Sequence, residues 1–168
     1  MQLTHYTTNF KQQQFPVTVI AENVTNAPNI GSLFRTCDAF GVEKLVFCGS
    51  NIPLGRKMTK TSRATEKVVN YEVTESALDL VKTLKSDGYT IVSLEITGNS
   101  KTLHDFKIKN KQPIVLIVGD ENFGISEDIL KLCHTIVHID MFGQNSSMNV
   151  VQATSIALYE ITKQISAK

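Results

Sequence analysis

Apolar and β-branched residues recur in six short runs along the chain, and each run predicts a β-strand. The runs occupy residues 17–21, 45–48, 68–73, 89–94, 114–118 and 135–139. Residues 114–118 are apolar at every position, whereas a strand with one solvent-exposed face alternates apolar and polar residues. This run is typical of a strand that helices cover on both sides, as in a parallel sheet.

Between these runs, apolar residues at intervals of three and four predict helices. The predicted helices occupy residues 30–40, 74–86, 126–132 and 149–165. Thr74 and Ser126 are the expected N-terminal caps of the second and third helix, and the polar stretch 55–67 is expected to be a connection. Strands alternating with helices predict an α/β fold, a mostly parallel sheet with helices on both faces. We expect one domain over residues 1–168, with residues 1–16 as a short lead-in.

In sheets of this kind, ligands bind beyond the carboxyl ends of the strands. The loops to inspect for function are therefore those that follow Ala21, Leu94, Val118 and Ile139.

Composition narrows the function classes. The chain has 17 basic and 16 acidic residues, a formal charge of +1, which excludes a broadly basic coat, an acidic tail and a disordered polyelectrolyte. Cys37, Cys48 and Cys133 are far apart and odd in number, which favours reduced thiols and a cytoplasmic location. The longest apolar run is too short to span a bilayer, so we expect no membrane partner. His134 and His138 lack further ligands at metal-binding spacing, so we expect no metal site.

The loop after the first predicted strand is rich in asparagine and leads into a helix that carries Arg35. On the simpler interpretation, Asn26 or Asn29 caps the helix and Arg35 lies on its surface. On the functional interpretation, Asn29 and Arg35 converge on an anionic or hydroxyl-bearing substrate, because arginine presents fixed donors that suit phosphate. The loop alone does not decide between the two.

Two later loops add carboxylates, glycines and small polar groups. Gly119 and Gly124 flank Asp120 and Glu121, and glycines permit sharp turns and close approach to a ligand. This loop lacks the glycine pattern of a dinucleotide site and the lysine of a P-loop. The alternative to a ligand-binding loop is a solvent-exposed turn without a function. The segment 140–149 offers hydroxyl, amide and methionine groups for neutral ligand contacts, unless its serines only cap the last helix.

Three segments, in order, carry a more specific signal. They are Asn29-Ile-Gly-Ser-Leu-Phe-Arg35, Gly119-Asp-Glu121-Asn-Phe-Gly124, and Ile139-Asp-Met-Phe-Gly143 with Ser147-Met-Asn149-Val. Together they resemble the three motifs of the SpoU (TrmH-like) RNA 2′-O-ribose methyltransferases of the SPOUT class, a resemblance that extends from residue 17 to residue 165. Asp140 stands where the family usually has proline, and Met148 where it usually has leucine.

The resemblance implies S-adenosylmethionine as methyl donor, a trefoil knot at the C-terminal end, RNA as substrate, and a homodimer with the site near the subunit interface. By motif position, the implied catalytic residues are Asn29, Arg35, Glu121, Ser147 and Asn149. The implied cofactor-binding residues are Leu94, Gly119, Gly124, Ile139, Ser147 and Met148. Many relatives carry an additional N-terminal RNA-binding domain. Since few residues precede the first strand here, we expect tRNA rather than rRNA as the substrate.

Methyl transfer from a sulfonium to a hydroxyl is a single in-line displacement, which needs proximity, alignment and help in losing the hydroxyl proton. Arginine is effectively never deprotonated in proteins. We therefore expect Arg35 to stabilise developing alkoxide charge and to bind the adjacent phosphate, while Glu121 and Asn149 orient Arg35 and the ribose.

A further group of cations lies in the polar stretch before the third strand. Together with Arg35, the predicted RNA-binding residues are Arg56, Lys57, Lys60 and Arg63, with Lys67 close by. Such a group contacts phosphates and makes binding sensitive to salt. The alternative is a solvated loop face.

Two other functions stay open at this point. One is a non-catalytic module that binds RNA or S-adenosylmethionine without turnover, against which the five catalytic-type residues argue. The other is a SPOUT enzyme that methylates a base nitrogen, for which the loop pattern is the poorer match. A Rossmann oxidoreductase is disfavoured, because the early glycine loop is missing.

Overall fold

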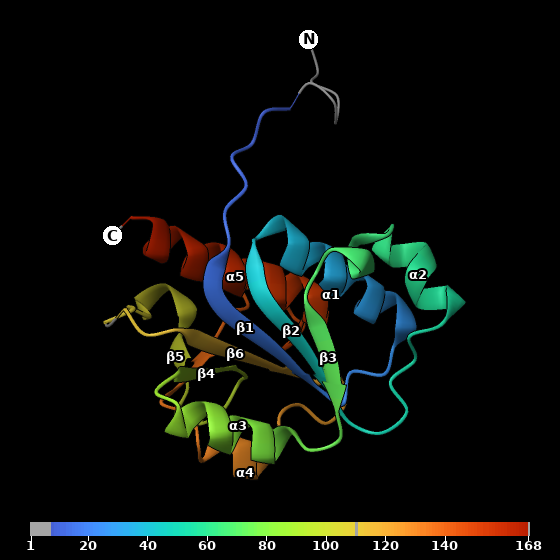
Figure 1. The fold of residues 1–168 in the computed structure, drawn as a ribbon. Helices are drawn as coiled ribbons and strands as arrows, with labels where there is room; N and C mark the ends of the chain where they lie inside the picture. Colours follow the sequence, from blue (N-terminus) through green and yellow to red (C-terminus); the bar gives the residue numbers. More distant parts are fainter. Residues whose placement is uncertain (1–7, 110, 168) are drawn as a thin grey trace.

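Among the described residues of the computed structural model, 8–109 and 111–167, seven strands form one sheet (Figure 1). The strands are β1 (Phe15–Glu22), β2 (Val42–Cys48), β3 (Tyr71–Thr74), β4 (Thr90–Leu94), β5 (Lys101–Thr102), β6 (Ile114–Gly119) and β7 (Thr135–His138). Their order across the sheet is β3-β2-β1-β6-β4-β7-β5, and each neighbouring pair is parallel. The predicted α/β class with a parallel sheet is confirmed.

Helices cover both faces of this sheet. They are α1 (Ala27–Ala39), α2 (Arg56–Ser62), α3 (Ala77–Ser86), α4 (Glu127–Leu130) and α5 (Val150–Ser166), with short 3-10 helices η1 (Thr65–Lys67) and η2 (Leu103–Asp105). In Figure 1, α1, α2 and α5 lie over one face and α3 and α4 over the other. Side chains that alternate along the strands build a core on each face. In β1, Val19 packs in the core of α1 and α5, whereas Ile20 packs in the core of α3 and α4.

The structure differs from the predicted elements in the stretch 55–67. This stretch was expected to be a connection, but it forms α2 and η1. In α2 the buried residues are Met58 and Ser62, so the helix carries too little apolar pattern to be recognised. The two-residue strand β5 has no pattern of its own and was also missed.

The helix caps follow the predictions in part. Asn26 caps α1, and its Oδ1 accepts the Asn29 N–H at 3.1 Å. The prediction of Thr74 as a cap is wrong, because α3 begins later and the Ser76 hydroxyl accepts the Asp79 N–H at 3.2 Å. Ser126 occupies the cap position of α4, but its side chain makes no capping hydrogen bond.

The register of the strands brings four loops together at one edge of the sheet. Glu22, the last residue of β1, pairs with Gly119, the last residue of β6. Leu94, the last residue of β4, pairs with Val137 of β7. The loops that follow β1, β6, β4 and β7 therefore start side by side, at the edge where parallel sheets bind ligands.

Several expectations are not decided by this arrangement. The trefoil knot, the single-domain interpretation, the homodimer and the cytoplasmic location stay predictions. Of the predicted lead-in, residues 1–7 lie outside the described residues. Within the described part of the chain, no helix is long and apolar enough to cross a membrane, and no three metal-binding side chains gather at one point. The three cysteines are free thiols.

Candidate active site

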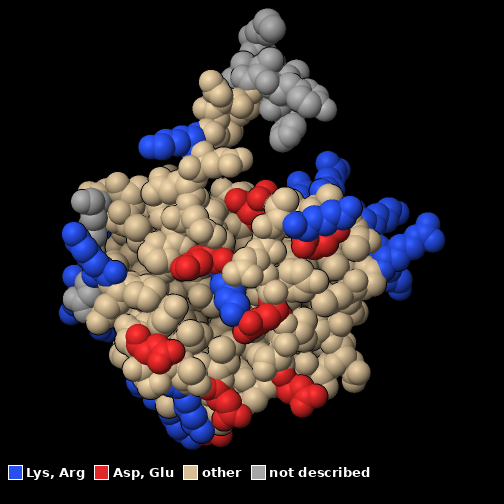
Figure 2. Space-filling view, viewed as in Figure 1, with Lys and Arg blue, Asp and Glu red and all other residues tan. Residues whose placement is uncertain are grey.

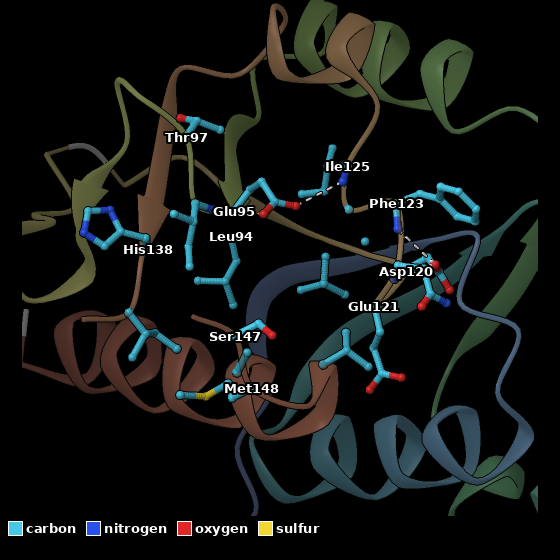
Figure 3. A pocket seen from close by; sticks show the side chains of 18 of the residues that line it. Leu94, Glu95, Thr97, Asp120, Glu121, Phe123, Ile125, His138, Ser147 and Met148 are labelled. Atoms are coloured by element: carbon cyan, nitrogen blue, oxygen red, sulfur yellow. Dashed lines mark hydrogen bonds between the residues drawn. The ribbon is translucent and has the colours of Figure 1, made fainter. Parts of the chain in front are cut away.

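A cavity of about 470 Å³ lies at the edge of the sheet where these loops meet (Figure 3). The segments after β4, β6 and β7, together with the first turn of α5, supply its lining. All six residues expected to bind the cofactor line this cavity. They are Leu94, Gly119, Gly124, Ile139, Ser147 and Met148. The structure thus brings together residues that are up to 54 positions apart in the sequence.

The lining combines apolar surface with negative charge. Val118, Ile139 and Met148 are among its apolar side chains, and the carboxylates of Glu95 and Asp120 also belong to it. Among the described lining residues there is no lysine or arginine. A ligand that is partly apolar and positively charged fits such a site, because carboxylates stabilise a nearby cation.

Three of the predicted catalytic side chains form a hydrogen-bonded cluster beside the cavity. The Glu121 carboxylate, which Figure 3 shows pointing toward α1 and α5, accepts two amide N–H groups on its Oε1. These come from Asn29 Nδ2 at 3.1 Å and from Asn149 Nδ2 at 2.8 Å. Asn149 Nδ2 also contacts Asn29 Oδ1 at 3.1 Å. We call Asn29, Glu121 and Asn149 the amide–carboxylate cluster.

Asn149 is held by its position at the start of α5. Its Oδ1 caps the helix by accepting the Val151 N–H at 2.9 Å. The amide nitrogen is therefore the part of this side chain that faces Asn29 and Glu121. The expectation that a serine of the segment 140–149 caps this helix is therefore wrong, because Asn149 is the cap. The catalytic role of Asn149 stays a prediction.

The loop after β6 is tightly folded. Asp120 Oδ1 accepts the N–H groups of Asn122 at 2.8 Å and Phe123 at 3.2 Å, and the Asp120 carbonyl accepts the Gly124 N–H at 2.8 Å. A Cβ atom at Gly119 would overlap the backbone of Gly124, and Gly124 itself has a φ of +66°. Both glycines are therefore required by the backbone of this turn.

Glu95 is a functional-site residue that the sequence analysis missed. Its Oε2 accepts the Ile125 N–H at 3.1 Å and its Oε1 accepts the Ile96 N–H at 2.9 Å, so it ties the loop after β4 to the loop after β6. The available signal was its place directly after Leu94, at the carboxyl end of an inner strand.

His138 and Asp140 anchor the segment after β7. His138 lines the cavity, and its Nδ1 lies 2.9 Å from Ser100 Oγ and its Nε2 3.5 Å from Asp140 Oδ1. Thr102 Oγ1 donates to Asp140 Oδ2 at 2.6 Å. Asp140, which departs from the SpoU pattern, therefore fixes this segment to β5 by side-chain contacts.

Two predicted catalytic residues lie outside the cluster. Ser147 is exposed and lines the cavity. Arg35 is exposed on α1, six positions after Asn29, which turns it about 120° away around a helix. Among residues 8–109 and 111–167, the Arg35 guanidinium has no hydrogen-bond or ion-pair partner, and it is not a lining residue.

The predicted RNA-binding cations gather on and after α2. We call Arg56, Lys57, Lys60, Arg63 and Lys67 the α2 patch. All five side chains are exposed, and Figure 2 shows lysine and arginine gathered over this helix, at the upper right. Ser62 donates to the Glu66 carboxylate within the patch, and this bond lowers the pKa of Glu66.

Close helix packing places the α2 patch next to the first turns of α1. A Cβ atom at Gly31 would lie 2.5 Å from the Met58 carbonyl oxygen and 2.9 Å from the Ser62 nitrogen. The backbones of α1 and α2 therefore touch only two residues after Asn29, so the α2 patch lies beside the N-terminal half of α1.

Residues 16–159 match the model of the SpoU rRNA Methylase family, a span that includes all three motifs. The chain belongs to this family. Membership in the SpoU family confirms the resemblance found in the sequence and makes the chain a methyltransferase.

Individual relatives agree with this assignment. A tRNA (guanosine(18)-2′-O)-methyltransferase of Aquifex aeolicus (strain VF5) is 29% identical over 154 residues, which are 92% of this chain and 72% of the relative. The crystal structure of the A. aeolicus TrmH/SpoU tRNA modifying enzyme has a TM-score of 0.84 at 29% identity, over 93% of this chain and 78% of that one. The SpoU methyltransferase AviRb from Streptomyces viridochromogenes, in complex with AdoMet, has a TM-score of 0.79 at 26% identity, over 95% of this chain and 63% of that one.

Proposed function

We propose that this SpoU-family chain uses S-adenosylmethionine to methylate a ribose 2′-hydroxyl of a tRNA. The observation that carries the proposal is the amide–carboxylate cluster, in which three motifs meet beside one cavity. The name of the A. aeolicus relative, a tRNA 2′-O-methyltransferase, supports the acceptor, and the AdoMet complex of AviRb supports the donor.

The cavity fits this donor. Its volume of about 470 Å³ lies in the usual range for small-molecule sites, ~300–1,000 Å³. Leu94, Ile139 and Met148 offer apolar contacts, Gly119 contributes to the lining, and Ser147 offers a hydroxyl. When bound, the donor supplies an electrophilic methyl group on a sulfonium. The carboxylates of the lining complement the positive charge of that group.

The amide–carboxylate cluster would position the acceptor ribose. Glu121 Oε1 already binds both amides, whereas Glu121 Oε2 has no partner among the described residues. A free carboxylate oxygen accepts a hydrogen bond from a hydroxyl, and an amide N–H donates one. The cluster therefore offers an acceptor and donors for a ribose, held in place by three mutual hydrogen bonds.

We assign Arg35 the stabilisation of alkoxide charge and a contact with a phosphate, as the guanidinium fork suits both. Its exposed place on α1 requires that another molecule brings the reacting groups to it. The RNA is one such molecule, and a second copy of the chain is the other.

We propose a homodimer that covers the outer face of α1 and α5. Thr36 and Ser155 lie 3.3 Å apart through their hydroxyl oxygens, so these helices are neighbours and Arg35 lies close to α5. On α5, Ile156 is 42% and Tyr159 61% exposed, although both are large and apolar. Burial of such side chains drives association. A second copy seated here would also cover Arg35.

The α2 patch would bind RNA phosphates. Its five exposed cations lie next to the helix that carries Asn29, so a backbone bound there passes the site. Contacts of this kind release counterions, and the affinity for RNA then falls as salt is added.

The deciding experiment supplies the protein with methyl-labelled S-adenosylmethionine and unmodified bulk tRNA, and identifies labelled nucleosides by mass spectrometry after digestion. We expect 2′-O-methylated nucleosides. The variant Glu121→Ala should lose this product, and Glu75→Ala, which removes an exposed carboxylate with no described partner, should retain it.

Other outcomes would replace the proposal. A label on a base nitrogen would make the chain a base methyltransferase. A label in rRNA but not in tRNA would overturn the substrate. Binding of the donor in calorimetry without transfer to either RNA would favour a non-catalytic module.

A further inference from the structure

Phe123 is the feature of the site that the reaction as derived so far does not use. It follows Glu121 by two positions and is 91% exposed. An aromatic side chain with this much surface in water loses the favourable burial that phenylalanine normally gains in a folded protein. Phe123 belongs to the lining of the candidate cavity, so its exposed ring is available to a molecule that binds at this site.

The loop holds the Phe123 backbone in one place. The Phe123 N–H donates to Asp120 Oδ1 at 3.2 Å, and the neighbouring Gly124 N–H donates to the Asp120 carbonyl at 2.8 Å. The ring is therefore presented from a fixed turn. Figure 3 shows it pointing away from the cavity, while the Glu121 carboxylate points toward α1 and α5.

We propose that Phe123 stacks on a nucleobase of the substrate RNA, at or next to the nucleotide that is methylated. This inference rests on the proposed function and adds to it an unpaired base as the recognised element. Two residues of extended chain span at most ~7 Å, so the Cα atoms of Glu121 and Phe123 are close together, and the ring leaves the same turn as the carboxylate that would hold the ribose. Proteins that recognise RNA stack unpaired bases on aromatic rings in this way.

Base stacking is the contact that fits best among the possible partners of the ring. The methyl donor belongs in the cavity; Phe123 is among the lining residues, but Figure 3 shows its ring pointing away from the centre of the cavity. The outer face of α1 and α5 presents its own apolar residues, Ile156 and Tyr159, for a second copy of the chain. The α2 patch, beside the helix that carries Asn29, supplies the positive charge that an RNA backbone requires, whereas a neutral apolar partner would not need it.

A fluorescence experiment tests the contact directly. The chain contains no tryptophan, so Phe123→Trp introduces a single indole at the ring position. We expect tRNA to quench this fluorescence, because a stacked base quenches indole, and the donor alone to leave it unchanged. The control is Phe10→Trp, since Phe10 is 88% exposed but lies before β1, at the opposite edge of the sheet. Quenching by the donor alone, or equal quenching of both variants, would overturn the proposal.

Kinetics on the full-length protein provide the second test. Phe123→Ala and Phe123→Leu should raise the KM for tRNA about tenfold, the effect of losing one stacked base, whereas Phe123→Tyr should restore it. The affinity for S-adenosylmethionine should not change, and Phe10→Ala should behave like the wild type.

The outcomes separate this inference from the proposed function. If the wild type does not methylate tRNA, the proposed function is wrong. If the wild type does so and Phe123→Leu keeps the wild-type KM, stacking is wrong and the function stands. If Phe123→Ala instead shifts the protein toward monomers in light scattering while tRNA binding is unchanged, the ring belongs to an interface between copies.

Discussion

At the scale of single residues, one carboxylate oxygen organises the site. Glu121 Oε1 accepts from Asn29 and from Asn149, and without it the two amides keep their bond to each other and the bond of Asn149 Oδ1 to the Val151 N–H. Hydrogen bonds to a charged group contribute ~1.5–3 kcal/mol each, more than bonds between neutral groups. The geometry of the acceptor site therefore depends on Glu121 more than on either asparagine.

Replacing Glu121 with alanine should lower the rate of methyl transfer by about 30-fold or more, because a loss of ~2 kcal/mol of positioning has that effect. Stability should change little, since the side chain is exposed. Single-turnover transfer and thermal unfolding measure the two effects, with Glu75→Ala as the control. A wild-type rate in Glu121→Ala would show that the cluster does not position the acceptor.

Gly119→Ala should impair the donor cavity. The new Cβ would overlap the Gly124 backbone and lie 2.7 Å from the Ile125 nitrogen, so the loop after β6 must move. We expect a loss of stability of ~1–3 kcal/mol, typical of overpacking, and weaker donor binding in calorimetry. Gly98→Ala is the control, because its Cβ would meet no atom within 4 Å. Equal donor affinity in both variants would contradict the expectation that the contact between residue 119 and the Gly124 backbone shapes the donor cavity.

Most of the site residues were predictable, and those that were not share a physical reason. Asn29, Glu121 and Asn149 stand in motifs with specific spacing, so the sequence indicated them before the structure joined them. Glu95 acts through a bond to the backbone N–H of Ile125, 30 positions away, and Asp140 through Thr102, 38 positions away. Local patterns carry no information on such partners.

At the scale of elements, the contact between α1 and α2 links the fold to RNA binding. Gly31→Ala would place a Cβ atom 2.5 Å from the Met58 carbonyl oxygen and 2.8 Å from Thr61 Cβ. We expect a loss of ~1–3 kcal/mol, and a melting temperature lower by ~2–4 °C for each kcal/mol. RNA affinity should also fall, because the α2 patch moves with its helix.

The control for this prediction is the adjacent variant Ser32→Ala, which adds an alanine to the same helix where the residue is only half-buried. Calorimetry and filter binding measure the two effects. If Gly31→Ala and the wild type had the same melting temperature, the prediction that α1 and α2 are too close for a Cβ atom would be wrong.

The junction of β4 and β7 should sense pH through His134. Its Nδ1 accepts the Ile91 N–H at 2.9 Å, which requires a neutral ring, and burial together with Lys85 lowers its pKa from the ordinary value near 6.5. The unfolded chain therefore takes up the proton first as the pH falls. This contribution to stability is complete above pH ~6.5 and is lost as the pH falls through the folded-state pKa.

In denaturation curves between pH 7.5 and 5, the free energy of unfolding should fall less in His134→Gln than in the wild type, because the glutamine amide oxygen still accepts but does not titrate. His104→Gln, at an exposed site, is the control. If the free energy of unfolding depended on pH identically in His134→Gln and the wild type, the proposed contribution of His134 would be wrong.

The elements themselves were predictable where apolar pattern is strong. The runs that became β1, β2, β4, β6 and β7 are continuous and β-branched, since these strands are buried between two helical layers. Helix α2 escaped prediction because it lies at the surface with few buried residues, and the exposed cations that hide its pattern are the ones expected to bind RNA. The residues expected to bind RNA are thus the ones that make α2 hard to predict from the sequence.

At the scale of the whole molecule, the position of Arg35 makes the homodimer testable. If Arg35 of one copy serves the cluster of the other, a mixture of Arg35→Ala and Glu121→Ala proteins should regain activity. Random exchange gives about half heterodimers with one intact site of two, or about a quarter of wild-type activity. Transfer to tRNA before and after subunit exchange is the measurement. No recovery in demonstrated heterodimers would place Arg35 in the site of its own copy.

The large sequence separation between the residues of the amide–carboxylate cluster also has a consequence for biosynthesis. Asn29 meets a partner 92 positions later in Glu121 and another 120 positions later in Asn149. At ~5–20 residues per second, a ribosome needs roughly 6–24 s to make Asn149 after Asn29. Throughout that interval a nascent chain has an incomplete site, so the newly made protein stays catalytically silent until its final helix has left the ribosome and docked.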